Sequence, residues 1–286
     1  MKALSAIPLL VFEVIWQVKK KIGIVMLFTV LLTGCVSLAN NWLEHEGTYL
    51  VAHRGAHIIA PENTVESIHQ AKILGYQAVE IDVRTSRDGV NFLMHDDTLD
   101  RTTDGTGKPE TYTIKQLKKF NLDTKNYPEY VNKKVKIPTF EEAVKEIKKN
   151  NLIVNVDGSK GNWQDEHFVN DIVNTLKQNS VYERSFFVLT DKKIRDEVVK
   201  NHPDCTVSWL YDQKNKLEDE IEQVKSYKKA LLSVSNDAAT EETINKLNKS
   251  GIEYQVYGVN DVKRFEVLKK SSVPIVETDE INPSDL

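Results

Sequence analysis

The sequence predicts an α/β fold built on a parallel sheet, and three observations support this prediction. Short apolar runs of strand length recur along the chain from residue 49 onward. Amphipathic segments with helix start and stop signals lie between many of these runs, an alternation typical of parallel sheets. The chain of 286 residues, 40% hydrophobic and 28% charged, has an ordinary globular composition. Its length suits one α/β barrel, which needs about 250 residues.

Nine segments are predicted as strands, one more than an eight-stranded barrel needs. They are residues 49–53, 78–84, 91–95, 152–157, 185–189, 206–210, 230–234, 254–258 and 274–277. The second and third are separated by Arg87-Asp88-Gly89, a hairpin signal that leaves no room for a crossover helix. We therefore expect 91–95 to fold back beside 78–84, outside the regular alternation.

Helices are predicted from their start and stop signals. Gly75 would end the helix that begins after Thr64, and Thr139 with Glu142 forms a capping box at the start of another. Asn260 is a candidate cap for the helix over 261–270. Residues 97–136 form a long polar excursion, too small for a separate domain and of a length that is usually functional or disordered.

The first 34 residues have the pattern of a secretory signal. Lys19-Lys20-Lys21 precedes an apolar run of about a dozen residues, which is short for a membrane span. Leu32-Thr33-Gly34-Cys35 resembles the lipobox of bacterial lipoproteins, which implies cleavage before Cys35 and lipidation of its thiol. An uncleaved anchor helix or a buried strand is the alternative. The predicted organisation is a signal (1–34), a polar tether (35–48) and one domain (49–286), lipid-anchored in a bacterial cell envelope and facing the periplasm or the exterior.

Charge and cysteine content argue against a general nucleic-acid binder and against a disulfide-stabilised domain. Residues 1–34 carry four lysines and one glutamate, so the mature chain has 34 basic and 41 acidic residues and a net charge of −7. A general nucleic-acid binder would need a basic face. Cys205 is the sole thiol beyond Cys35, so the domain has no internal disulfide, and Cys205 is expected in the core.

Two acids share one face of the predicted strand 78–84. In Ala78-Val-Glu-Ile-Asp-Val83, the residues Val79, Ile81 and Val83 face one way, and Glu80 and Asp82 face the other. Two carboxylates on an inner barrel face would repel each other and need a cation or a proton. A hard divalent metal meets that need. Pairing of each acid with Lys or Arg is the alternative.

The segment Leu152-Ile-Val-Asn-Val-Asp-Gly-Ser-Lys160 repeats this alternation. Asn155 and Asp157 face inward, and Asp157 is either a third carboxylate ligand or a plain turn aspartate. Lys160 follows the glycine turn and is a candidate for substrate binding.

Two histidines end predicted strands near these acids. His53 and His95 suit general acid–base chemistry on a phosphate ester beside a metal. Arg54 would bind the anionic phosphate through its planar guanidinium.

Several motifs, in order and spacing, resemble the bacterial glycerophosphodiester phosphodiesterase family. They are AHRGA, PENT, EIDV, HDDTLDRTTDGTG and IPTFEEA, and the resemblance extends from about residue 49 to the end of the chain. It implies a TIM (β/α)8 barrel of the phospholipase-C-like phosphodiesterase type, with the extra hairpin strand near 84–95. The site would lie at the carboxyl ends of the barrel strands.

The resemblance also implies residue roles. His53 and His95 would be the acid–base pair, Glu80 and Asp82 would hold Ca²⁺ or Mg²⁺, and Arg54 would contact the phosphate. The implied reaction is hydrolysis of a small glycerophosphodiester to sn-glycerol 3-phosphate and an alcohol. In the family, the glutamate of PENT lies near the site. Glu62 is therefore a candidate supporting residue, or else an acid that complements the helix dipole.

The sequence departs from the family pattern at two places. In the family's usual N-x-E-x-K pattern, the glutamate is the third metal ligand. This chain has Asp157 at the glutamate position, Ser159 at the lysine position and Lys160 one residue later, so the resemblance implies Asp157 as the third ligand. Where many relatives have Trp, this chain has Tyr257, which would line the pocket or fill the barrel interior.

Two alternative functions remain open. One is a sphingomyelinase D-like or lysophospholipase D activity on membrane lipids, which a lipid anchor would bring within reach. The other is a weakened surface protein that binds glycerophosphoryl groups without turnover, although intact His53 and His95 argue against it. The expected partners are the small diester and the membrane, with no nucleic acid.

Overall fold

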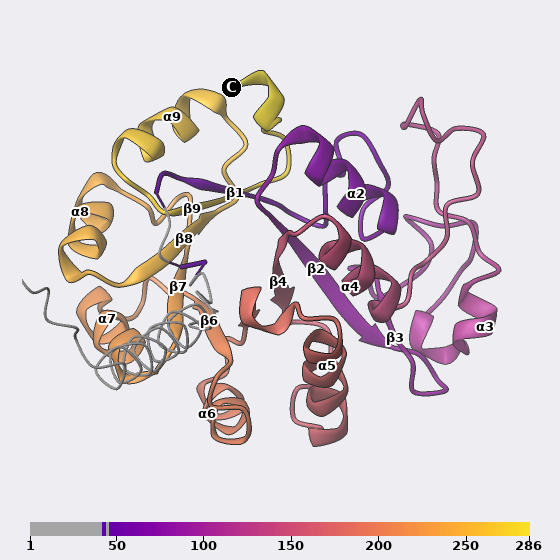
Figure 1. Ribbon diagram of the computed structural model, residues 1–286, viewed down its shortest axis with the longest axis horizontal. Helices are drawn as coiled ribbons and strands as arrows, with labels where there is room; N and C mark the ends of the chain where they lie inside the picture. The colour runs from indigo at the N-terminus through magenta and orange to yellow at the C-terminus, as the bar shows by residue number, and fades with distance from the viewer. Residues whose placement is uncertain (1–41, 44–45) are drawn as a thin grey trace, which may run out of the picture. The chain divides into compact units, whose positions relative to one another are not determined.

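The computed structural model describes residues 42–43 and 46–286, so the predicted signal and Cys35 lie outside the described residues. Within this part of the chain, eight parallel strands form a closed barrel (Figure 1). They are β1 (Tyr49–Ala52), β2 (Ala78–Thr85), β4 (Ile153–Asp157), β5 (Ser185–Val188), β6 (Thr206–Leu210), β7 (Ala230–Ser235), β8 (Glu253–Tyr257) and β9 (Ile275–Thr278). The barrel closes because β1 pairs with both β9 and β2. The predicted TIM barrel is confirmed.

The ninth strand, β3 (Asn91–Leu93), pairs antiparallel with β2. Leu93 lies opposite Val83, and Asn91 lies opposite Thr85. The predicted hairpin outside the βα alternation is therefore confirmed. The strand ends two residues earlier than expected, and His95 lies in the loop that follows it.

Helices surround the barrel, as Figure 1 shows. They are α2 (Val65–Leu74), α4 (Phe140–Lys149), α5 (Glu166–Gln178), α6 (Lys192–Asn201), α7 (Leu217–Ser226), α8 (Glu241–Ser250) and α9 (Val262–Lys270). The capping box of Thr139 and Glu142 opens α4 as predicted. The cap expected at Asn260 is wrong: Asp261 accepts the Arg264 N–H at 2.8 Å, while the side-chain oxygen of Asn260 accepts the backbone N–H of Asp279.

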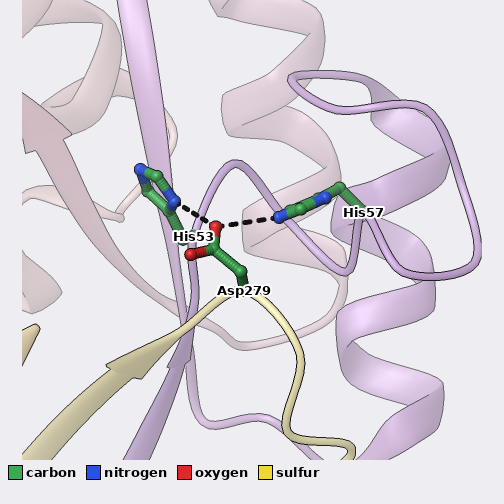
Figure 2. A group of neighbouring side chains, drawn as sticks. All are labelled: His53, His57 and Asp279. Atoms are coloured by element: carbon green, nitrogen blue, oxygen red, sulfur yellow. Dashed lines mark hydrogen bonds and ion pairs between the residues drawn. The ribbon is translucent and has the colours of Figure 1, made fainter. Parts of the chain in front are cut away.

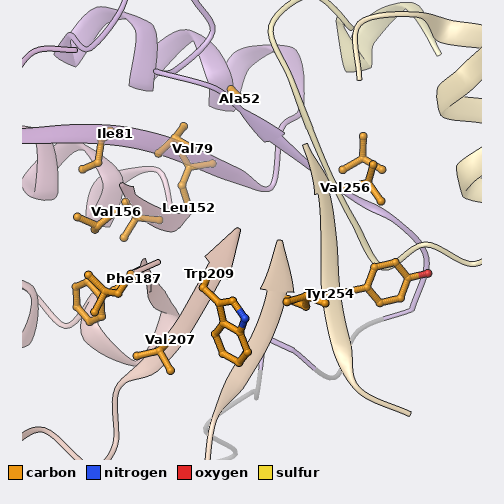
Figure 3. Packing of buried hydrophobic residues seen from close by; sticks show 14 of the residues in the cluster. Ala52, Val79, Ile81, Leu152, Val156, Phe187, Val207, Trp209, Tyr254 and Val256 are labelled. Atoms are coloured by element: carbon orange, nitrogen blue, oxygen red, sulfur yellow. The ribbon is translucent and has the colours of Figure 1, made fainter. Parts of the chain in front are cut away.

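The main core lies between the outer face of the strands and the helices. Figure 3 shows Val79, Ile81 and Val156 in this layer, as the alternation predicts. Cys205 is 3% exposed and belongs to the same core, which confirms its predicted burial. Removing so many branched side chains from water is the main source of stability for such a barrel.

A second apolar cluster fills the amino-terminal end of the barrel interior. Trp42 stacks on Phe186 with ring centroids 5.4 Å apart, and Leu43 and Val51 pack in the same cluster. Trp42 and Leu43, two residues of the predicted tether, are therefore buried with the barrel. Apolar packing at this end leaves the opposite, carboxyl end for polar side chains.

The long excursion between β3 and α4 is folded and packed. It contains η1 (Pro109–Thr111) and α3 (Ile114–Leu117), and its apolar side chains join Phe92 of β3 in a third cluster. Two further short helical turns are η2 (Tyr182–Arg184) and η3 (Pro283–Asp285). None of the helices in the described ranges is long and apolar enough to cross a membrane.

Candidate active site

The three predicted carboxylates meet at the carboxyl ends of β2 and β4. Asp82 and Asp157 are partners in the register of these neighbouring strands, and Glu80 lies one inward position below. One oxygen of each acid lies within 4.8 Å of the others. Glu80 and Asp82 are 3% and 2% exposed, whereas Asp157 is half-buried. Strand periodicity and register thus unite acids from two separate sequence segments.

Crowding of the acids changes their protonation. Burial, followed by the charges of Asp82, Glu277 and Asp157, raises the pKa of Glu80 well above its ordinary value. Burial also raises the pKa of Asp82, against the hydrogen bond from Asn63. A bound divalent cation would offset this repulsion. Three hard oxygen ligands in a buried acidic site therefore fit Ca²⁺ or Mg²⁺.

The predicted alternative, a basic partner for each acid, holds only in part. Arg54 Nε lies 3.6 Å from Asp82 Oδ2. Glu80 instead accepts the backbone N–H of Arg54 at 2.9 Å, and His53 Nε2 lies 3.8 Å from the same carboxylate oxygen. Glu80 is thus contacted by a backbone N–H and an imidazole rather than by a guanidinium.

Arg54 has a left-handed backbone, with φ 57°. Its Nη1 donates to Glu62 Oε1 at 3.1 Å, and its buried Nε has no hydrogen-bond partner among the described residues. Glu62 precedes the helix cap Thr64, so it lies outside the first turn of α2. Burial opposes ionisation of Glu62, but hydrogen bonds and charges from Arg101 and Arg54 hold its pKa below the ordinary value. These contacts fit an orienting role for Glu62.

Asn63 of the PENT segment contacts a predicted metal ligand, and this role was not predicted from the sequence. Asn63 Nδ2 donates to Asp82 Oδ2 at 2.8 Å, and Asn63 Oδ1 accepts the Asp82 backbone N–H at 3.0 Å. Asn63 therefore fixes both the side chain and the backbone of a predicted ligand. The PENT motif could have pointed to Asn63, but its contact with Asp82 on β2 depends on the tertiary fold.

The ring of His53 is held by a residue from the far end of the chain. Its Nδ1 lies 2.6 Å from Asp279 Oδ1, and His57 Nε2 lies 3.0 Å from the same oxygen (Figure 2). These bonds hold the pKa of Asp279 below its ordinary value. Burial works against charging of His53, but the Asp279 hydrogen bond and the charges of Glu277 and Asp279 raise its pKa overall.

Neither His57 nor Asp279 was predicted from the sequence. His57 follows the AHRGA motif directly, and Asp279 lies near the end of the chain, outside the five motifs that carry the resemblance. The oxygen and ring nitrogens of His53, His57 and Asp279 lie within 4.8 Å of one another. Two hydrogen bonds to one carboxylate oxygen account for that proximity.

His95 is oriented in a similar way. Its Nδ1 lies 2.8 Å from Asp96 Oδ1 in the loop after β3. Its charge acts on Asp82, whose pKa it lowers against the dominant effect of burial. The preceding residue, Met94, donates its backbone N–H to the carbonyl oxygen of Asp82 at 3.1 Å, which places this loop beside the end of β2 that carries Asp82.

A cavity of about 240 Å³ opens beside these groups. His53, Glu80 and Asp157 line it together with Tyr257 and Glu277. The lining position of Tyr257 supports its predicted place in the pocket. Glu277 is a buried acid that was not predicted from the sequence.

Lys160 is not brought to this cavity or to the neighbouring one of about 390 Å³ that shares Asp157 with it. The described contact of Lys160 is electrostatic: after the hydrogen bond from Arg84, its charge helps to lower the pKa of Asp97. Arg54 and His95 are likewise absent from both linings, so substrate binding by Lys160 stays a prediction.

The protein is a TIM barrel with an enzyme-like site. Its parallel strands form a closed barrel, and inner acids and oriented histidines lie at the carboxyl ends of these strands. The sequence profile of the Glycerophosphoryl diester phosphodiesterase family matches residues 53–282, and this chain belongs to that family.

Relatives with assigned activities match over parts of their length. Glycerophosphodiester phosphodiesterase 1 of Homo sapiens is 43% identical over 107 residues, which are 37% of this chain and 32% of the human protein. Glycerophosphodiester phosphodiesterase of Caldanaerobacter subterraneus is 28% identical over 164 residues, 57% of this chain and 67% of that protein. The match thus spans about a third of the human relative.

Solved structures share the fold. A phosphodiesterase of Oleispira antarctica, in complex with the product sn-glycerol-3-phosphate, superposes with a TM-score of 0.73 at 24% identity, covering 83% of this chain and 95% of that one. A glycerophosphodiester phosphodiesterase of Agrobacterium tumefaciens superposes with a TM-score of 0.70 at 21% identity, covering 83% of this chain and 97% of that one.

Proposed function

We propose that this protein is a metal-dependent glycerophosphodiester phosphodiesterase, which hydrolyses glycerophosphodiesters to sn-glycerol 3-phosphate and an alcohol. The convergence of Glu80, Asp82 and Asp157 within 4.8 Å, next to His53, carries the proposal. Carboxylate ligands and imidazoles are the groups that metal-assisted hydrolysis of a phosphate ester needs. Family membership agrees with it.

The three carboxylates would hold Ca²⁺ or Mg²⁺, which when bound supplies charge neutralisation for the phosphodiester. Arg54 would bind a phosphate oxygen, since its Nε has no hydrogen-bond partner among the described residues and its Nη1 is fixed by Glu62. A guanidinium held in this way is oriented before the substrate arrives.

The two histidines would move protons through their Nε2 atoms. His53 and His95 each use Nδ1 to contact a carboxylate, Asp279 and Asp96 respectively. Such a contact favours the tautomer with the proton on Nδ1, which leaves Nε2 for proton transfer. One histidine would take a proton from the glycerol 2-hydroxyl or from water, and the other would protonate the leaving alcohol.

Buried acceptors favour a substrate with free hydroxyl groups. Asn155 Oδ1 and Gln255 Oε1 have no hydrogen-bond donor among residues 42–43 and 46–286, and both residues line the cavity at 2% and 1% exposure. Unpaired buried acceptors are costly, and glycerol hydroxyls would satisfy them. An acylated glycerol or a ceramide offers fewer hydroxyls, so glycerophosphodiesters are favoured over the sphingomyelinase D-like and lysophospholipase D alternatives.

The lipobox at Leu32–Cys35 supports a further part of the proposal: attachment to the membrane through lipidated Cys35, outside the cytoplasmic membrane. Labelling of the full chain with a radioactive or clickable fatty acid would test it, with Cys35→Ala as the control. Incorporation that persists in Cys35→Ala would contradict it.

A coupled assay for sn-glycerol 3-phosphate tests the activity. Purified protein from residue 36 onward is given glycerophosphocholine with Ca²⁺, with Mg²⁺ and with EDTA. We expect product that depends on metal and disappears with EDTA. Absence of product with every metal, together with free choline from lysophosphatidylcholine or sphingomyelin, would favour the lipid alternatives. Absence of turnover on all these substrates, with binding of glycerophosphocholine retained, would favour the binding protein.

A further inference from the structure

Arg101, in the loop after β3, binds two carboxylates at once. Its Nε and Nη2 donate to Asp96 Oδ2 and Oδ1 at 2.5 and 2.9 Å. Its Nη1 and Nη2 donate to Glu62 Oε2 and Oε1 at 2.7 and 2.8 Å. Both carboxylates are thus held in bidentate geometry by a single guanidinium, and they hold its pKa above the ordinary value.

Each of these carboxylates also holds a predicted functional group. Asp96 Oδ1 accepts from His95 Nδ1 at 2.8 Å, and Glu62 Oε1 accepts from Arg54 Nη1 at 3.1 Å. One guanidinium therefore connects the imidazole expected to move a proton with the arginine expected to bind the phosphate. The two groups come from loops after different strands, β3 and β1.

We propose that Arg101 is the positioning residue that fixes His95 and Arg54 relative to each other; this inference rests on the proposed function. The side chains of Glu62 and Asp96 are 13% and 23% exposed, so their orientation depends on protein partners more than on water. A simple exposed ion pair contributes little to stability, but a network of bidentate bonds restricts geometry. The described hydrogen bonds of Arg101 go to Glu62 and Asp96, so it would act on Arg54 and His95 through these two carboxylates.

Substitution of Arg101 should impair the proposed reaction in both binding and turnover. In Arg101→Gln, loss of the guanidinium frees Asp96 and Glu62, so kcat should fall by about 10- to 100-fold and KM for glycerophosphocholine should rise several-fold. Arg101→Lys should be intermediate, because an ammonium is a point charge that cannot match both carboxylates in bidentate fashion.

Two further variants separate the effect of Arg101 on His95 from its effect on Arg54. Asp96→Asn acts on His95 and should lower kcat with little change in KM. Glu62→Gln acts on Arg54 and should mainly raise KM. Combined with Arg101→Gln, each should add less than its separate effect, because the residues form one network.

The matched control is Arg87→Gln. Arg87 is an exposed arginine of the β2–β3 turn whose guanidinium makes a 3.4 Å hydrogen bond to Gln116. Its removal should leave kcat and KM at the values of the unmodified protein. An equal loss in Arg87→Gln would mean that any charge change in this region disturbs the protein.

A measurement that needs no turnover completes the test. In ¹⁵N-histidine-labelled full chain, two-bond ¹H–¹⁵N correlations report which ring nitrogen of His95 carries the proton, with His95→Ala for assignment. We expect one Nδ1–H tautomer in the unmodified protein and Arg87→Gln, and a mixture in Arg101→Gln. Unchanged tautomer, kcat and KM in Arg101→Gln would overturn the proposal. If His95 loses its single tautomer in Arg101→Gln and no variant or unmodified protein has activity, the positioning role of Arg101 is supported and the proposed function is rejected.

Discussion

His53 Nδ1 and Asp279 Oδ1 lie 2.6 Å apart, although 226 residues separate them in the chain. They meet because the first and last strands of the barrel, β1 and β9, pair with each other. The contact orients the ring of the histidine and helps to raise its pKa, so it connects closure of the barrel with the chemistry proposed for the site.

Asp279→Asn should lower kcat by about 10²- to 10⁴-fold, since an amide no longer favours the required tautomer or the imidazolium. Asp279 raises the pKa of His53, so the pH limb due to His53 should move to lower pH whether His53 is base or acid. The measurement is a pH profile of kcat/KM. A His53 limb that stays in place would show that Asp279 does not set this titration.

Without metal, the free energy of unfolding should fall as pH rises above the ordinary carboxylate range. The pKa of Glu80, Asp82 and Glu277 is raised in the folded state, mainly by burial, so the folded protein binds more protons than the unfolded one and loses stability as pH rises. Added Ca²⁺ should therefore raise Tm more at pH 8 than at pH 5. Thermal unfolding with EDTA or with Ca²⁺ at each pH measures this difference in Tm. The pH dependence of Tm without metal should weaken in Glu80→Gln.

Asp157 is tested by a pair of substitutions. Asp157→Asn should weaken Ca²⁺ binding by at least about tenfold, because a charged ligand is lost. Asp157→Glu should retain or improve the affinity, since it restores the family residue. Isothermal titration with Ca²⁺ distinguishes the variants. Equal affinity in Asp157→Asn and the unmodified protein would remove Asp157 from the ligand set.

His53→Ala and His95→Ala should each abolish turnover while the barrel survives, because both rings lie at its rim and are 28% and 33% exposed. Circular dichroism checks the fold, and release of sn-glycerol 3-phosphate checks activity. Undiminished kcat in either variant would refute the acid–base role of that histidine.

Gly55→Ala should destabilise the protein by about 2 kcal/mol or more. Gly55 has φ 76°, and an added Cβ would lie 2.7 Å from Ser67 Cβ of α2. Gly89→Ala is the matched control, because Gly89 has φ 81° but open space around it. Urea unfolding should show the larger loss for Gly55→Ala. Equal losses would mean that backbone strain alone, without the α2 contact, accounts for the effect.

Much of the fold could be predicted because strand and helix periodicity are local properties of the sequence. Alternation placed Glu80 and Asp82 on the inner face, and the turn at Arg87–Gly89 predicted β3. The cap at Asp261 was missed because Asn260, an equally good capping residue, has a competing partner in Asp279. A choice between adjacent cap residues depends on such tertiary contacts.

By itself, the sequence determined the strands, the acids on their inward faces, the histidines that follow two of them, and the family motifs, since each depends on residues close together in the chain. Only the tertiary structure decided which groups meet: Asp279 with His53, Asn63 with Asp82, and Arg101 with Glu62 and Asp96. Periodicity assigns a side chain to a face of the sheet. Its partner across that face depends on strand register, barrel closure and loop packing, which join residues far apart in the chain.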